Sequence, residues 1–285
     1  MTETCCCCRT GVSTKEGSMV ATAKFQPGAT TTAATALQTG SQAAPAATPS
    51  IRLLGGFEVV TSGIALVLPQ SSQRLLVYLA LAGRAQNRAV IAGSLWPDKS
   101  DERAAANLRS ALWRLTHYDS RTVAPPHEGV VLVDARGSML SLAAPVEVDF
   151  RELERAGWAL VRGEQDLDGI DPWRPSLYQE LLPGWYDDWV LVERERLAQL
   201  RLHFLEALAR NLRGVQRAAE ALDVALRLVA ADPLRERSRI VLVETYLAEG
   251  NRAAAVRQVE QYDALCRATF GCGPTSALAA ALALD

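Results

Sequence analysis

The chain has 285 residues, of which 49% are hydrophobic and 22% are charged. This balance is typical of a globular protein with a real core, and it excludes a chain that is disordered throughout. The length leaves room for two domains and a flexible extension, because single domains usually have roughly 100–200 residues. No run approaches about 18 consecutive apolar residues, and no signal peptide begins the chain, so we expect a cytoplasmic protein without a membrane segment.

The net charge of −2 is distributed unevenly along the chain. Residues 1–50 carry +1, residues 51–148 carry +2 and residues 149–285 carry −5, so we expect any anion-binding surface in the first half. Nearly all of the 30 basic residues are arginines, which suit bidentate contact with phosphate or guanine. A coding bias toward GC-rich codons explains the same excess of arginine.

Residues 1–50 are predicted to be a disordered extension, because they are rich in Thr, Ala, Gly, Ser, Gln and Pro and have no apolar periodicity. Four of the six cysteines form the run Cys5–Cys8, and their spacing matches neither a zinc site nor a disulfide framework. A redox or metal-sensing tail, an extension without structure and a translation start at Met19 remain open for this segment. We expect no cofactor and no resident metal.

Residues 51–148 are predicted to form a small domain of strands and helices. Two β-rich runs, 51–60 and 64–69, predict an antiparallel hairpin. A first helix is expected from Ser71 or Ser72 to Gly83, where the glycine ends it. Further along, the pattern predicts a short helix over 89–96, a third helix over 101–117 and a hairpin of strands 130–134 and 138–142. Strand, three helices and hairpin is the order of a winged helix-turn-helix.

The third helix has two distinct faces when each residue is turned by about 100°. Its apolar face is predicted to hold Ala104, Leu108, Ala111, Leu112 and Leu115. Its polar face is predicted to hold Arg103, Asn107, Ser110, Arg114 and His117. We expect Ala106 and Trp113 at one edge of the polar face and Arg109 beyond Trp113 on the flank.

The polar face of the third helix has the chemistry of a recognition helix. Arginine can pair with guanine O6 and N7, and asparagine with adenine N6 and N7, in the major groove. Other side chains can reach the DNA backbone from the hairpin tip and from the start of the first helix. The predicted DNA-binding residues are therefore Arg103, Asn107, Ser110, Arg114, Arg109, Arg136, Gln73 and Arg74. Each of them is equally compatible with an ordinary solvated surface.

After residue 149 the sequence predicts helices throughout. We expect one helix over 151–162, a long connection over 163–184 and the longest helix over 186–212. A glycine followed by alanines recurs 36 residues later, at Gly214 and at Gly250. This spacing is close to the tetratricopeptide period of about 34 residues, so the fold class predicted for 149–285 is an all-α, tetratricopeptide-like array.

Five aromatic residues are concentrated near the start of the long helix: Trp173, Tyr178, Trp185, Tyr186 and Trp189. We expect them to close the end of the repeat core. A small-molecule or peptide pocket lined by them is the alternative.

The sequence resembles a known family of regulators over most of 51–283. The phrases IRLLGGFEV at 51–59, LWP at 95–97 and AANLRSALWRL at 105–115 look like the OmpR-like winged helix of the SARP (antibiotic regulatory protein) transcriptional activators. The second half is similar to their bacterial transcriptional activator domain, on the phrases VDFREL at 148–153, DPLRER at 232–237, GNRAAA at 250–255 and FGCGPTSAL at 270–278.

This resemblance implies binding to repeated promoter sites, a homodimer on DNA, contact with RNA polymerase and activation of a gene cluster, often one of secondary metabolism. In the family the third helix is the recognition helix, which implies that role for Arg103, Asn107, Ser110 and Arg114. The implied domains are an extension over 1–50, a winged helix over 51–148 and a bacterial transcriptional activator domain over 149–285. The charge of +2 on the winged domain is modest for a DNA-binding domain.

An enzyme is not expected, because the three histidines are scattered and the sequence contains no HExxH, GxSxG or GxxxxGK[ST] motif. The alternative to a DNA-binding activator is an adaptor whose repeats bind a protein partner. In that alternative, the winged domain serves dimerisation or protein docking.

Overall fold

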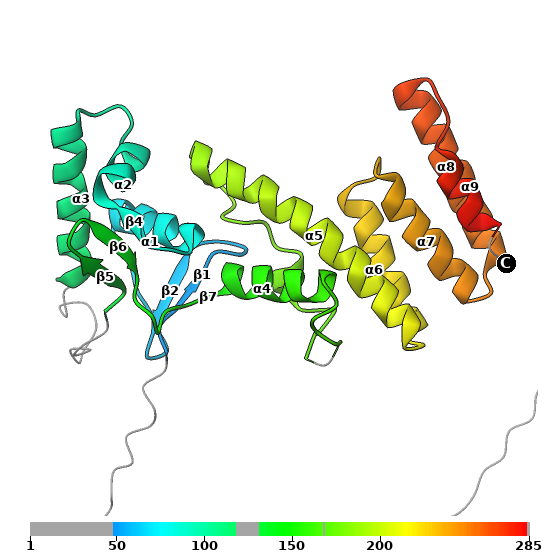
Figure 1. Cartoon of the computed structure of the whole chain (residues 1–285), viewed down its shortest axis with the longest axis horizontal. Coiled ribbons are helices and arrows are strands. Elements are labelled where there is room, and N and C mark those ends of the chain that lie inside the picture. Colours follow the sequence, from blue (N-terminus) through cyan, green and yellow to red (C-terminus); the bar gives the residue numbers. More distant parts are fainter. Residues whose placement is uncertain (1–47, 118–130, 168, 284–285) are drawn as a thin grey trace, which may run out of the picture. The chain divides into compact units, whose positions relative to one another are not determined.

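The computed structural model describes residues 48–117, 131–167 and 169–283. The Cys5–Cys8 run, Met19 and the disorder predicted for residues 1–47 lie outside these ranges. The described part begins with a small region of sheets and helices and continues as a helical domain (Figure 1).

The first sheet contains four short strands in the order β3-β2-β1-β7. Their bounds are β1 Ser50–Arg52, β2 Glu58–Thr61, β3 Ile64–Ala65 and β7 Glu147–Val148. The predicted hairpin around residues 61–63 is observed as the antiparallel pair β2 and β3. The run 51–60 is not one strand, because Gly55 and Gly56 adopt φ values of 81° and 150° and turn the chain back, so that β1 pairs with β2. Strand β7 pairs parallel to β1, with Val148 opposite Ile51.

Three helices follow the first three strands: α1 Gln70–Ala82, α2 Arg88–Leu95 and α3 Asp101–Thr116. The predicted cap of α1 at Ser71 or Ser72 is wrong, because the helix begins directly after Pro69. Ser72 is buried instead, and its hydroxyl donates to the carbonyl of Ala111 in α3 at 3.2 Å. Gly83 ends α1 with a φ of 68°, as predicted.

The second sheet contains three strands in the order β4-β6-β5. Their bounds are β4 Gln86–Asn87, β5 Val133–Arg136 and β6 Met139–Leu142. Strands β5 and β6 form the predicted hairpin, with Arg136 paired to Met139 across the turn. The chain between α1 and α2 joins this sheet as β4, and Arg88 Nε donates to the carbonyl of Gly137 at 3.1 Å. Three helices followed by a hairpin are consistent with a winged helix.

Gly137 lies in the hairpin turn with a φ of 58°, in the left-handed region that side chains with a Cβ avoid. No atom lies within 4 Å of the position that a Cβ would occupy there. Gly137→Ala is therefore expected to lower the free energy of unfolding by about 1 kcal/mol through backbone strain alone. Chemical denaturation of the two proteins measures this difference, and equal midpoints and slopes would contradict the assignment of this turn.

The helical domain follows the second sheet (Figure 1). Its elements are α4 Asp149–Val161, the 3-10 helix η1 Pro175–Leu177, α5 Asp188–Gly214, α6 Ala218–Ala231, α7 Glu236–Ala248, α8 Arg252–Phe270 and α9 Ser276–Leu282. Each helix from α4 to α8 packs against the next helix of this series. The predicted breaks are observed at residues 232–233 and at Gly250, which adopts a φ of 72°. Between α5 and α6 the left-handed residue is Gln216 rather than Gly214.

The hydrophobic core of the first half does not end with β7. Its buried cluster runs from Ile51 to Leu197 and includes Leu181, Leu182 and Val190 from the segment around the start of α5. Residues from the second half of the sequence therefore complete the core of the strand-containing first half. A chain cut after residue 148 would expose this apolar surface to water.

The aromatic residues near α5 do not gather in one place. Trp185 packs against Phe57, with ring centroids 6.1 Å apart, and Trp189 packs edge-on against Tyr78 at 5.4 Å. Both tryptophans thus contact the core of the first half, whereas Trp173 is exposed beside Arg227. The prediction that these aromatic residues close the end of the repeat core is wrong for Trp185 and Trp189.

Asp149 joins the first residue of α4 to the first sheet. Its carboxylate accepts hydrogen bonds from three backbone amides, those of Leu53 at 2.8 Å, Leu54 at 3.1 Å and Phe150 at 2.7 Å. Burial raises the pKa of the Asp149 carboxyl, and the three hydrogen bonds oppose that shift. One side chain therefore accepts hydrogen bonds from the backbone directly after β1 and from the start of α4, and so holds the two segments together.

Two arginines donate to backbone carbonyls near the junction of the two halves. Arg151 in α4 donates to the carbonyls of Leu79 and Ala80 at the end of α1, both at 2.8 Å. Arg194 in α5 donates to the carbonyls of Leu181 at 3.0 Å, Leu182 at 2.7 Å and Trp185 at 3.0 Å. Arg151 thus satisfies carbonyls at the end of α1 and ties α4 to it, whereas Arg194 satisfies carbonyls of the irregular segment before α5.

Glu206 is a buried acid that connects α5 to α7. It pairs with Arg210 at 2.8 Å, with Arg235 at 3.6 Å and with Arg237. A buried carboxylate is costly without such partners, so this network fixes the contact between the two helices. A second pair, Arg213 and Glu244 at 2.9 Å, joins the same helices further along.

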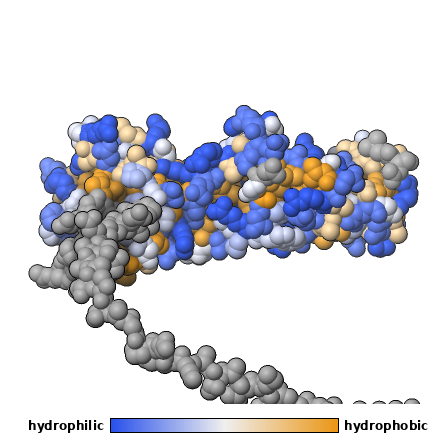
Figure 2. Space-filling model, turned by 90° about the horizontal axis from the view of Figure 1, so that it is seen from below, coloured by the Kyte–Doolittle hydropathy of each residue, from blue (hydrophilic) through white to orange (hydrophobic). Residues whose placement is uncertain are grey.

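Hydrophilic residues cover much of the surface seen in Figure 2, and hydrophobic residues form smaller areas between them. Among the described residues, none of the helices is both long enough and apolar enough to span a membrane.

Candidate nucleic-acid interface

The candidate interface is built on α3, and the local sequence explains where this helix begins and ends. The residues 96–100 form a short turn after α2, in which the amide of Lys99 donates to the carbonyl of Trp96 at 3.1 Å. Asp101 and Glu102 lie in the first turn of α3 and Arg114 lies in its last turn, so the charges complement the helix dipole. Helix, short turn and helix is the arrangement that presents a second helix to DNA.

The buried face of α3 contains Ala104, Leu108 and Ala111, and Leu112 and Leu115 are half-buried against the same core. The apolar face predicted from the sequence is therefore observed. The small alanines let α3 approach α1 closely, and the hydrogen bond from Ser72 to Ala111 ties the two helices together.

The predicted recognition residues lie on the solvent side of α3. Arg103, Ser110 and Arg114 are exposed, and Asn107 is half-buried. Among the described residues, Arg103 has no ion pair and no hydrogen-bond partner. Arg114 Nη1 donates to Ser71 Oγ at 3.2 Å, and the hydroxyl of Ser110 donates to the carbonyl of Ala106 at 3.0 Å. Both contacts are at the surface, where a ligand can replace them at low cost.

The exposed face is wider than the sequence predicted. Arg109 and Trp113 are fully part of it, although we expected them on the flank and at the edge. With about 100° per residue, Ala106, Trp113 and His117 lie opposite the buried line of Ala104, Leu108 and Ala111. The predicted polar face is centred near Arg114 because it is defined by side-chain polarity, whereas the exposed face is centred opposite the buried residues. Glu102 is also exposed, so the face includes one acid.

Gln73, Arg74 and Arg136 lie outside α3, and each one has a partner within the chain. Gln73 Nε2 donates to the carbonyl of Leu68 at 2.7 Å. Arg74 forms a half-buried ion pair with Asp187 at 2.5 Å. Arg136 at the hairpin is highly exposed and pairs with Asp134 at 2.8 Å. Contact between these three residues and DNA stays a prediction, and Arg74 would first have to break its ion pair with Asp187.

The five predicted residues of α3 and Arg136 of the hairpin lie on separate elements, and each element contacts a neighbouring helix. Ser71 brings the start of α1 beside Arg114, and Arg88 brings the start of α2 to the hairpin turn. No local sequence pattern predicts either contact, because both depend on tertiary packing. Together they place Arg114 beside the start of α1 and Arg88 beside the hairpin turn.

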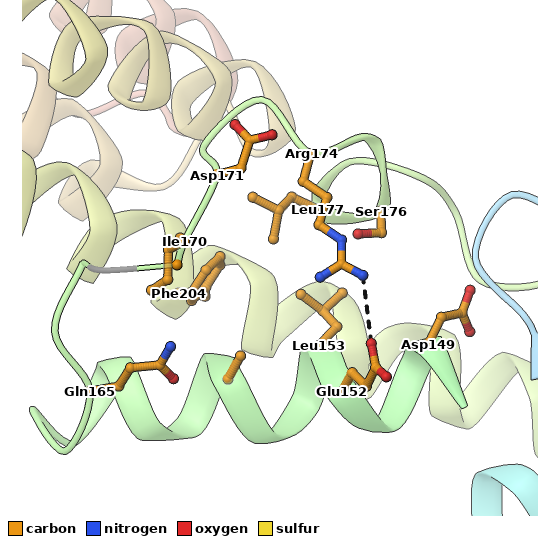
Figure 3. Close-up of a pocket in the computed structure, with 12 residues that line it drawn as sticks. Asp149, Glu152, Leu153, Gln165, Ile170, Asp171, Arg174, Ser176, Leu177 and Phe204 are labelled. Atoms are coloured by element: carbon orange, nitrogen blue, oxygen red, sulfur yellow. Dashed lines mark ion pairs between the residues drawn. The ribbon is translucent and has the colours of Figure 1, made fainter. Parts of the chain in front are cut away.

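A small pocket lies in the helical domain, between α4, α5 and the segment before η1 (Figure 3). Arg174 reaches across it to Glu152, with 3.5 Å between the charged groups. The pocket has a volume of about 70 Å³, which holds only a few water molecules. None of the aromatic residues predicted to line a ligand pocket lines this one, but two of them, Trp185 and Tyr186, line a larger, more open pocket of about 340 Å³ with Gln70, Arg74, Gly184 and Asp187. No group of three or more metal-ligating side chains occurs among the described residues.

Residues 149–283 match the family described as the bacterial transcriptional activator domain. The chain has no significant match among curated proteins. It is similar in fold to Mycobacterium tuberculosis EmbR, whose structure was solved in complex with a low affinity phosphopeptide, with a TM-score of 0.62 and 16% sequence identity.

The fold match covers 83% of this chain and 64% of the EmbR chain, so this chain spans less than two thirds of that protein. It extends across the strand-containing half as well as the helical half, whereas the family match covers the helical half. Residues 149–283, just under half of the chain, thus match the bacterial transcriptional activator domain family, as the sequence predicts for the second half, and the fold of the chain is similar to that of EmbR.

Proposed function

We propose that this protein is a sequence-specific, DNA-binding transcriptional activator and that α3 is its recognition helix. The observation that carries the proposal is the solvent face of α3, where Arg103, Arg109 and Arg114 are exposed and no acid beyond the first turn opposes them. This face follows a short helix and turn and precedes a hairpin, which is the setting in which a helix enters the major groove.

The chemistry of this face favours base contact over phosphate contact alone. Arg103 has no partner within the described chain, so its guanidinium can form two hydrogen bonds to a guanine without breaking an ion pair. Ser110 and Asn107 add hydrogen-bonding groups that accept or donate to several bases. The charge of +2 over residues 51–148 is low, so specific contacts must supply more of the affinity than general attraction to phosphate does.

The finer parts of the proposal concern the helical domain. We infer a tetratricopeptide-like arrangement for α5 to α8, supported by the successive packing of these helices and by the matching breaks near Gly214 and Gly250. Further proposals are contact with RNA polymerase, a homodimer on DNA, regulation of a biosynthetic gene cluster, a cytoplasmic location and the absence of enzymatic activity. The family of residues 149–283 supports an activating role for the domain.

The test is DNA binding by the full chain. Labelled duplexes from the region upstream of its own gene, and duplexes selected from a random pool, are titrated with protein at several salt concentrations. A complex that resists excess non-specific DNA, and weakens as salt rises, supports the proposal. If no duplex is preferred over non-specific DNA, the adaptor with a winged domain that does not bind DNA replaces it. The full chain is needed because α5 completes the core of the first half.

A further inference from the structure

Trp113 is a large apolar side chain exposed at the centre of the α3 face. Its exposed fraction is 61%, although tryptophan usually buries most of its surface. With about 100° per residue, it lies within about 20° of Ala106, which precedes it by two helical turns. Arg109 and Ser110 lie on either side of this line, at about 40° and 60° from Trp113.

A neighbouring ring on the exposed surface of α3 holds the Trp113 indole in place. The ring of His117 stacks on it, with centroids 4.6 Å apart and an angle of 16° between the planes. His117 is itself fixed, because its Nδ1 lies 3.0 Å from the carbonyl of Trp113 and 2.9 Å from Thr116 Oγ1. A side chain that is ordered before binding loses less conformational entropy when it meets a ligand.

We propose that Trp113 contacts thymine methyl groups in the major groove and thereby contributes to sequence specificity. The inference rests on the proposed function and deepens it. The C5 methyl of thymine is the only apolar group that a base presents in the major groove, so an exposed apolar side chain on a recognition helix can distinguish thymine there. Trp113 has no positive charge with which to bind phosphate.

Trp113 and Ala106 form an apolar line along α3. Ala106 and Trp113 are separated by about 10 Å along the helix axis, which is about three base-pair steps of B-DNA. Both are apolar and on the same line, and the groups beside them are polar. Exposed Glu102 lies at the N-terminal end of this line, about 20° from Trp113 and one turn before Ala106, so the part that can approach a methyl group is the stretch around Trp113. Arg109 and Ser110 remain available for hydrogen bonds on either side.

The test compares two versions of one duplex, the preferred site selected from a random pool by the parent chain. In the second version every thymine is replaced by uracil, which pairs identically and lacks the methyl group. The parent is expected to bind the uracil duplex roughly four-fold more weakly for each methyl contacted. Trp113→Ala is expected to bind both duplexes equally, and Trp113→Phe to keep part of the preference.

Trp158→Ala is the matched control, because Trp158 is an exposed tryptophan on α4 and its loss is expected to leave the parent's preference unchanged. The inference is overturned if the parent shows no preference for thymine or if Trp113→Ala retains it. Failure of the proposed function gives a different result, because then the random pool yields no preferred site.

Discussion

Replacing Arg103 and Arg114 together by alanine is expected to weaken specific DNA binding by on the order of 30-fold to 20,000-fold. Each arginine that reads a base contributes about 1–3 kcal/mol, and the two lie on separate turns of α3 without a shared partner among the described residues. The free energy of unfolding should change little, because both side chains are exposed. Titration of a labelled duplex, with anisotropy as the readout, measures the loss.

The control for this double variant is a pair that removes the same charge elsewhere. Arg155 in α4 and Arg257 in α8 are both exposed, so Arg155→Ala with Arg257→Ala lowers the net charge by the same amount. If the control pair weakens binding as much as the α3 pair, general electrostatic attraction carries the binding. If neither pair weakens it, the assignment of α3 is wrong.

Asp149→Ala is expected to lower the free energy of unfolding by about 2–4 kcal/mol. The variant leaves the amides of Leu53, Leu54 and Phe150 without their acceptor at a site that is largely shielded from water. Asp149→Asn should recover only part of the loss, because one atom of the amide group is a donor and would face a backbone donor. Denaturant titration followed by circular dichroism measures the change.

Asp188→Ala provides the comparison for this variant. Asp188 is likewise an acid in the first turn of a helix, but it is exposed. Its loss is expected to cost less than about 1 kcal/mol, from the helix dipole alone. Equal effects of the two substitutions would show that Asp149 acts only through the dipole and does not hold β1 to α4.

The sequence predicted the helices of the first half well because their ends have strong local signals. Pro97 and the acids that follow it mark the start of α3 to within one residue, and Gly83 marks the end of α1. The strands β4 and β7 were missed, since two residues are too few for an alternating pattern. Both exist because neighbouring strands offer partners, which a local pattern cannot reveal.

For the candidate site, the sequence predicted the types of side chain on α3 better than it predicted their contacts and orientation. The arginines of α3 follow from residue type and spacing, and they are exposed as expected. Arg74 was predicted to face DNA, but Asp187, more than a hundred residues later, is its partner in the fold. Trp113 was placed at an edge because polarity was used to centre the face, whereas burial shows it opposite the core. These differences all arise from contacts between segments distant in sequence.

The most direct measurement for the central claim, that α3 reads bases, is the binding of parent and Arg114→Ala to a panel of duplexes. Each duplex changes one base pair of the preferred site. If Arg114 reads a base, one position that costs the parent about 1–3 kcal/mol when changed is expected to cost the variant nothing, while all other positions keep their penalties. The claim is contradicted if the variant keeps every penalty of the parent, because the side chain then contacts no base.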